Sequence, residues 1–164
     1  MAVLNPEDCV AQRSPARLIR RLSKTMTALV ESRFDGRDLS FPQWIALKAV
    51  RDGLVRNAGE LARELGITTG ATTRLIDGLE ERGLLCRDRA CADRRVVQLA
   101  VTEEGRSAVA ELMGHVVGAW NDVVADIDQA EVEAMAATAR KMLEAAERLF
   151  CANDASAANR ESLL

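Results

Sequence analysis

The sequence is poor in aromatic residues and has no tyrosine. Phe and Trp together account for 3% of its 164 residues. A core must therefore be built from Leu, Val, Ala, Ile and Met, a composition that favours helices. No run of about 18 apolar residues occurs, which argues against a membrane-spanning helix. The first 13 residues lack a basic segment followed by an apolar one, so we predict no signal peptide and expect a cytoplasmic protein.

Groups that commonly perform catalysis or bind metals are also scarce. His115 is the only histidine, and no Ser-His-Asp set or pair of carboxylates suggests an active site. The cysteines do not fall at metal-ligand spacings such as C-x-x-C, so we predict free thiols without a structural zinc. The sequence therefore predicts a protein that is not an enzyme and has no cofactor. The four cysteines are Cys9, Cys86, Cys91 and Cys151.

Charge is distributed unevenly along a chain whose net charge is −3. Residues 1–55 hold nine basic and six acidic groups, residues 56–106 hold nine of each, and residues 107–164 hold four basic and ten acidic groups. Within the neutral middle part, residues 82–95 contain five arginines (82, 87, 89, 94 and 95) against two aspartates. Arginines of this density favour contact with a phosphate backbone, whereas the acidic C-terminal part argues against DNA lying there.

A helix-turn-helix is predicted between residues 58 and 83. The first helix, Ala58–Leu65, ends at Gly66, because glycine readily adopts the left-handed conformation of a helix C-terminus. Thr68 or Thr69 can cap the second helix, which ends at Gly83. Two helices joined by a tight turn are typical of DNA-binding proteins. The core-facing residues of the second helix are Leu75, Ile76 and Leu79.

A two-stranded ribbon is predicted directly after the helix-turn-helix. Leu84–Arg89 and Arg94–Val101 favour extended backbone, and Ala90–Asp93 forms a plausible hairpin tip. Thr102 then caps a long helix with two acidic residues in its first turn. A ribbon in this position is a wing, so the expected fold is mostly α, a winged helix-turn-helix with long N- and C-terminal dimerisation helices.

The flanking helices are predicted from apolar residues at helical spacing. One helix runs from Pro15 to Phe34, another from Ser40 to Arg51, and two long ones follow Thr102 and Asp128. The predicted segments are a flexible N-terminus (1–13), a dimerisation helix (14–35), a winged helix-turn-helix DNA-binding lobe (36–102), dimerisation helices (103–151) and a flexible tail (152–164).

The long flanking helices carry more apolar surface than one winged lobe can cover. Because burial contributes about 25 cal/mol per Å² of apolar surface, two solvent-exposed stripes would be costly. We therefore predict a homodimer. In a two-fold dimer the second helices of the two lobes repeat at roughly 34 Å, which matches a pseudo-palindromic site on double-stranded DNA.

Two stretches resemble a known family. Residues 93–105 contain the run Asp-Arg-Arg-x-x-x-Leu-x-Val-Thr-x-x-Gly, which resembles the wing signature of the MarR family of bacterial transcription regulators. Residues 65–85, LGITTGATTRLIDGLEERGLL, are similar to the recognition helix of that family. The resemblance implies a dimeric DNA-binding repressor that a small, often phenolic or lipophilic, ligand releases from its operator. The hairpin tip is more compact than in many relatives, which leaves the reach of Arg89 open.

Candidate DNA contacts come from the second helix and the wing. Its N-terminal residues are small or polar, so this end can approach base edges. An arginine at a ribbon tip can enter a narrow minor groove, and the resemblance also favours Arg94 in this role. Asp93 would orient Arg94 or Arg95. Arg95 can instead form an internal salt bridge, and Arg74 can pair with Asp77 or Glu80. The candidates are Thr69, Thr72, Thr73, Arg74, Arg89, Arg94 and Arg95.

Other readings remain open at this stage. A helical module that binds protein partners would use the same long stripes, and its binding would not depend on salt. Oxidation of Cys86, Cys91 or Cys9 could switch the regulator, although cysteine is commonly just a small apolar residue. The ligand site is unknown, with Trp44 and the basic face of residues 17–24 as candidate lining.

Overall fold

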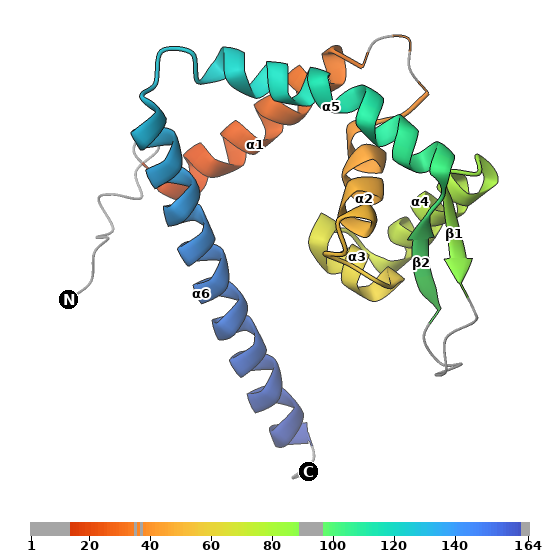
Figure 1. Cartoon of the computed structure of the whole chain (residues 1–164). Helices are drawn as coiled ribbons and strands as arrows, with labels where there is room; N and C mark the ends of the chain where they lie inside the picture. The colour runs from red at the N-terminus through yellow and green to blue at the C-terminus, as the bar shows by residue number, and fades with distance from the viewer. Residues whose placement is uncertain (1–13, 35, 37, 89–96, 162–164) are drawn as a thin grey trace. The chain divides into compact units, whose positions relative to one another are not determined.

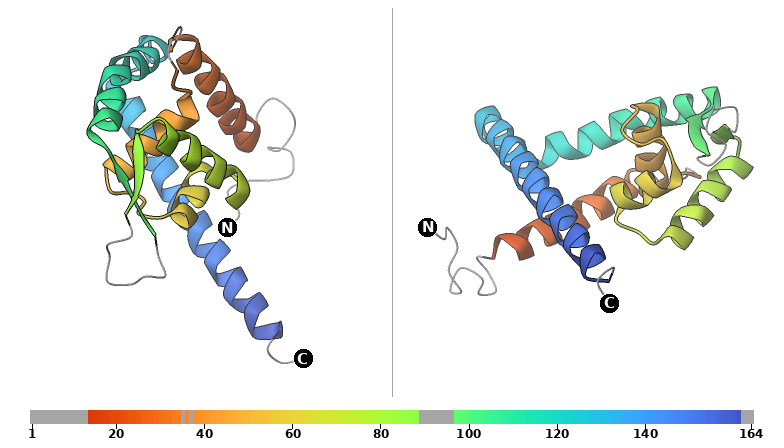
Figure 2. Two further views of the ribbon diagram at one scale, coloured as in Figure 1. Left: turned by 90° about the vertical axis from the view of Figure 1, so that its right-hand side faces the viewer. Right: turned by 90° about the horizontal axis from the view of Figure 1, so that it is seen from below.

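The computed structural model describes residues 14–34, 36, 38–88 and 97–161, with side chains described up to residue 150. Contacts divide the chain into two compact units on either side of the bond between Trp120 and Asn121, and each unit is considered by itself. The first unit contains the helix-turn-helix and the two-stranded ribbon (Figures 1 and 2).

The described residues form a mostly helical chain with one small antiparallel sheet, and this confirms the predicted winged helix-turn-helix (Figure 1). In chain order the elements are α1 (Pro15–Ser32), α2 (Phe41–Arg51), α3 (Ala58–Leu65), α4 (Thr69–Glu81), β1 (Leu85–Asp88), β2 (Gln98–Val101), α5 (Glu103–Val123) and α6 (Gln129–Glu161).

Polar side chains fix the starts of the first four helices. Each accepts a hydrogen bond from a backbone N–H of the first turn, which otherwise has no partner within the helix. At α2 the Gln43 side chain also accepts from the Ser40 backbone, at 3.0 Å, to complete a capping box. Of the two threonines considered for α4, Thr68 is the cap. The four capping residues are Ser14, Ser40, Asn57 and Thr68.

Two glycines with positive φ end the helices of the helix-turn-helix, as predicted. Gly66 (φ 62°) follows α3 and Gly83 (φ 67°) follows α4. A side chain at either position would be strained, because this region of backbone space favours glycine. The chain therefore turns sharply from α3 into α4, and again from α4 into β1.

The core of the first unit lies between α2, α3, α4, the ribbon and α5. Trp44 of α2 is buried, and its indole N–H donates to the carbonyl of Val109 in α5 at 3.1 Å. By contrast, Trp120 near the end of α5 is 39% exposed. The largest fully buried side chains are Leu47, Leu61, Ile76, Leu79, Leu85, Val30, Val109 and Thr72.

The ribbon pairs β1 with β2 in antiparallel register, from Leu85 opposite Val101 to Asp88 opposite Gln98. Its described strands are shorter than predicted, since residues 89–96 lie outside the described part. The backbone N–H of Leu99 donates to the carbonyl of Arg56 at 2.8 Å, which attaches the ribbon to the connection between α2 and α3. The base of the ribbon is thus part of the first unit's core.

The long helices differ from the prediction at their ends. α5 stops at Val123 instead of reaching Ile127, and α6 continues to Glu161, beyond the predicted boundary at residue 151. Alanines at 152, 155, 157 and 158 favour this continuation, because alanine has the highest helix propensity. Within the described residues, none of the helices combines the length and apolar character that crossing a membrane requires.

Candidate nucleic-acid interface

The N-terminal half of α4 presents a small polar surface to solvent. Thr69, Gly70, Thr73 and Arg74 are all exposed. The Thr73 hydroxyl donates to the Thr69 carbonyl at 3.0 Å, so it lies along the helix and still has lone pairs that can accept. A Cβ added at Gly70 would meet no atom within 4 Å. This surface is therefore open to the close approach of another molecule.

Thr72 does not belong to this surface, which corrects its prediction as a DNA contact. Its side chain is fully buried, and its hydroxyl donates to the carbonyl of Thr68 at 3.0 Å. The sequence held a signal for this, because Thr72 precedes buried Ile76 by four residues and Leu79 by seven. Those spacings place Thr72 on the core-facing side of α4.

Arg74 is exposed and forms no ion pair or hydrogen bond with another described residue. The sequence left open a pairing of Arg74 with Asp77 or Glu80. In the structure both carboxylates bind Arg87 of β1 instead. Arg74 is thus available for an external anion.

Arg87 joins the wing to α4 through three hydrogen bonds. Its Nη2 donates to Asp77 Oδ1 at 2.6 Å, its Nη1 donates to Glu80 Oε2, and its backbone N–H donates to Glu80 Oε1 at 3.2 Å. The hydrogen bond that Arg87 donates to Asp77 raises the pKa of Arg87 above its ordinary value, although partial burial opposes this. One arginine of the predicted basic cluster is therefore committed to an internal contact.

The Thr-x-x-Gly run at the start of α5 has a structural explanation. The Thr102 hydroxyl donates to the carbonyl of Gly83 at 2.6 Å and accepts from the backbone N–H of Gly105 at 3.0 Å. A Cβ at Gly105 would lie 2.0 Å from the carbonyl oxygen of Leu84. The end of α4, the base of the wing and the first turn of α5 therefore meet at one closely packed point.

Several predicted residues cannot be placed. Arg89, Asp93, Arg94 and Arg95 of the wing, together with Cys9 and Cys91, lie outside the described residues. Cys86 is described: it is an exposed free thiol on β1, with its Sγ 3.5 Å from the carbonyl oxygen of Ala100. The described part of the chain shows no group of three metal-ligating side chains.

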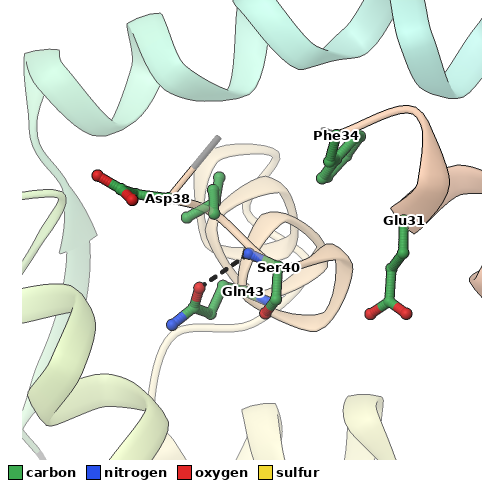
Figure 3. A pocket seen from close by; sticks show the side chains of 6 residues that line it. Glu31, Phe34, Asp38, Ser40 and Gln43 are labelled. Atoms are coloured by element: carbon green, nitrogen blue, oxygen red, sulfur yellow. Dashed lines mark hydrogen bonds between the residues drawn. The ribbon is translucent and has the colours of Figure 1, made fainter. Parts of the chain in front are cut away.

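A surface hollow that the sequence analysis did not predict lies between the end of α1 and the start of α2 (Figure 3). Its volume is about 420 Å³. Trp44 and the basic face of α1, the predicted candidates for ligand contact, do not line it. Its lining residues are Glu31, Phe34, Asp38, Leu39, Ser40 and Gln43.

A helix-turn-helix followed by a ribbon and a long helix defines a winged helix-turn-helix protein. Residues 37–95 match the model of the MarR family. Over those residues the chain is therefore similar to the MarR family, and its fold is the winged helix-turn-helix. Solved structures that resemble this chain include transcriptional regulators.

Three solved structures illustrate the likeness. The transcriptional regulator BldR from Sulfolobus solfataricus is 25% identical, with a TM-score of 0.74 over 86% of this chain and 99% of that one. BpsR from Bordetella bronchiseptica is also 25% identical, with a TM-score of 0.68 over 79% of this chain and 92% of that one. The DNA binding of BpsR is regulated by 6-hydroxynicotinic acid. Apo MarR from E. coli, at 22% identity and a TM-score of 0.68 over 79% and 96%, shares the fold.

Proposed function

We propose that this chain is a DNA-binding transcription regulator that acts as a homodimer on a pseudo-palindromic operator. The observation that supports this most directly is the exposed surface of α4. Arg74 projects there beside two threonines and a glycine, while its acidic neighbours Asp77 and Glu80 bind Arg87 instead of Arg74. A helix end of this kind fits a major groove, where arginine can form two hydrogen bonds to guanine.

The wing supplies the second part of the proposed interface. Arg94 would enter the minor groove, Arg89 and Arg95 would contact phosphates, and Asp93 would orient the arginines. Support comes from the place of the ribbon next to the end of α4, because β1 begins soon after α4 ends and its Arg87 binds two carboxylates of that helix. These four residues remain proposals from the sequence.

Dimerisation is supported by apolar side chains that the single chain leaves in contact with solvent. α1 exposes Leu18, Ile19 and Leu22 beside its basic residues. α6 is exposed along nearly its whole described length and carries an excess of acidic groups. Burial of these stripes in a second copy would contribute about 25 cal/mol per Å². The exposed apolar side chains of α6 are Met135, Met142, Leu143, Leu149 and Phe150.

Release by a small molecule completes the proposal, with the chain acting as a repressor. The ligand would be a small phenolic or lipophilic compound, in line with the pyridine acid that regulates DNA binding by BpsR. The two lobes of the dimer would adopt either a spacing that matches the two DNA half-sites or one that does not. The ligand must bind more tightly to the dimer with the mismatched spacing, because a ligand with equal affinity for both forms does not change their relative populations.

The decisive test is a titration of labelled duplex DNA at increasing salt. If six or more phosphates are contacted, the affinity should fall about a thousandfold or more between 50 and 200 mM salt. Binding that does not depend on salt, or no binding, would contradict the proposal and favour a helical module for protein partners. Duplexes selected from a random pool would then define the operator, and small acids and oxidants can be screened for release.

Arg74→Ala is expected to weaken binding to the selected duplex by about tenfold to a hundredfold, because a good arginine–guanine pair contributes about 1–3 kcal/mol of discrimination. Binding to random duplex should weaken much less. Arg140→Ala, which removes an exposed arginine from α6, is the matched control and should leave both affinities unchanged. An equal loss on both duplexes would place Arg74 on a phosphate instead of a base.

A further inference from the structure

The contact between Arg87 and α4 suggests a role that neither the fold nor the family likeness assigns. Asp77 and Glu80 lie almost one turn apart on α4, and both bind the guanidinium of Arg87. Glu80 uses both carboxylate oxygens, one for the side chain of Arg87 and one for its backbone N–H. The two acids therefore fix both the position and the direction of β1.

Arg87 occupies the inner side of the ribbon. Along β1 the side chains alternate, with Leu85 buried, Cys86 exposed, Arg87 partly buried and Asp88 exposed. Arg87 thus shares a face with core residue Leu85, and its side chain is 26% exposed. With two of its nitrogens bound to carboxylates, it is poorly placed to bind a phosphate.

The ribbon has other attachments, one on β2, where the N–H of Leu99 donates to the carbonyl of Arg56, and others at its base. Thr102 bonds to Gly83, and the N–H of Thr102 donates to the carbonyl of Leu84 at 3.3 Å. Arg87 lies farther along the ribbon, in the register pair opposite Leu99. The contact with Asp77 and Glu80 therefore holds β1 against α4 at a point beyond the base of the ribbon.

We propose that Asp77, Glu80 and Arg87 form a brace that sets the wing at the angle needed to reach the duplex together with α4. This inference rests on the proposed DNA binding and names three positioning residues for it. Its consequence is unusual: Asp77 and Glu80 increase the affinity for DNA, although each places a negative charge beside the DNA-facing helix.

The direction in which DNA affinity changes when Asp77 and Glu80 are neutralised distinguishes the proposed brace from a purely electrostatic effect. Removal of an acidic group near DNA ordinarily strengthens binding, because the repulsion of phosphates falls. If the brace acts as proposed, removal of these two acids weakens binding, since the wing loses its angle. Glu81 offers a matched control, because it lies on the same helix, is exposed and pairs with no described residue.

The experiment compares the full-length protein with the variants Asp77→Asn/Glu80→Gln and Glu81→Gln. Dissociation constants for one duplex are measured at several salt concentrations. The double variant should bind at least fivefold more weakly, with a shallower salt dependence because wing contacts are lost. Glu81→Gln should bind equally or more tightly. If the double variant binds more tightly with an unchanged salt dependence, the brace is refuted.

Arg87→Lys provides a second variant that keeps the positive charge. Lysine cannot replace the planar fork that spans two carboxylates, so binding should weaken as in the double variant. If Arg87 were a phosphate contact, lysine would largely preserve the affinity, and that result would overturn the proposal. Thermal unfolding of each variant identifies any that are not folded at the assay temperature. Absence of salt-dependent binding by the unmodified protein would instead refute DNA binding itself.

Discussion

Gly105→Ala is expected to destabilise the protein by about 3 kcal/mol, which corresponds to a decrease of roughly 10 °C in the midpoint of thermal unfolding. The added Cβ would lie 2.0 Å from the carbonyl oxygen of Leu84 and 2.7 Å from a methyl group of Val101. Backbone cannot yield as a flexible side chain can, so α5 would have to move away from the ribbon. That movement would also break the cap that Thr102 provides to Gly105.

Gly78→Ala is the matched control for Gly105→Ala. Gly78 lies inside α4, and an added Cβ would meet no atom within 4 Å. Alanine should therefore stabilise the protein by up to about 1 kcal/mol through its higher helix propensity. Both variants can be followed by circular dichroism during heating. Equal stability of the two variants would show that the first turn of α5 is not packed against Leu84 as described.

Met142→Glu/Leu143→Glu is expected to convert the proposed homodimer into monomers and to weaken binding to the proposed operator by about a hundredfold or more. Both residues lie on α6 and are at least half exposed in the single chain, so the change removes few contacts within a protomer. In the proposed dimer the two carboxylates would be buried without partners, which is strongly unfavourable. The lost affinity follows because two linked lobes bind with a high effective concentration that one lobe lacks.

The dimer prediction is measured by sedimentation and by DNA titration on the same samples. Ala137→Glu/Lys141→Gln changes the charge by the same amount on the opposite side of α6, and it should leave the dimer intact. A dimeric Met142→Glu/Leu143→Glu variant with full affinity would show that this side of α6 is not an interface. The predicted dimerisation segments would then need to be redefined.

The turns that end the two helices of the helix-turn-helix were the most predictable part of this structure. Gly66 and Gly83 end their helices as the sequence analysis predicts, because a positive φ after a helix depends on chemistry within a few residues. The order of helices and strands follows from these local signals. The class of fold could therefore be predicted before any tertiary contact was known.

The details of the site were less predictable, because they depend on which groups meet across elements. Arg87 counted toward a basic cluster in the sequence, yet it binds Asp77 and Glu80 across the junction of α4 and β1. That pairing in turn leaves Arg74 without the partners that helical spacing offered. Local spacing allows both arrangements, and only the packing of β1 against α4 selects one of them.

Thr72 shows a different limit. Its polarity favoured a role at the interface, whereas its position relative to Ile76 favoured the core, and the position prevailed. A buried threonine is tolerated because its hydroxyl bonds to the Thr68 carbonyl within the helix. Residue type alone therefore does not predict whether a side chain at the border between the buried and exposed faces of a helix points to the core or to solvent.

The contrasting environments of Trp44 and Trp120 have a practical consequence. With no tyrosine in the chain, intrinsic fluorescence arises almost entirely from these two indoles. Trp44 is enclosed and hydrogen-bonded to Val109, whereas Trp120 is partly open to water. Emission from a Trp120→Phe protein would therefore report on the interior of the DNA-binding lobe alone. A Trp44→Phe protein would give a separate optical signal from the far end of α5.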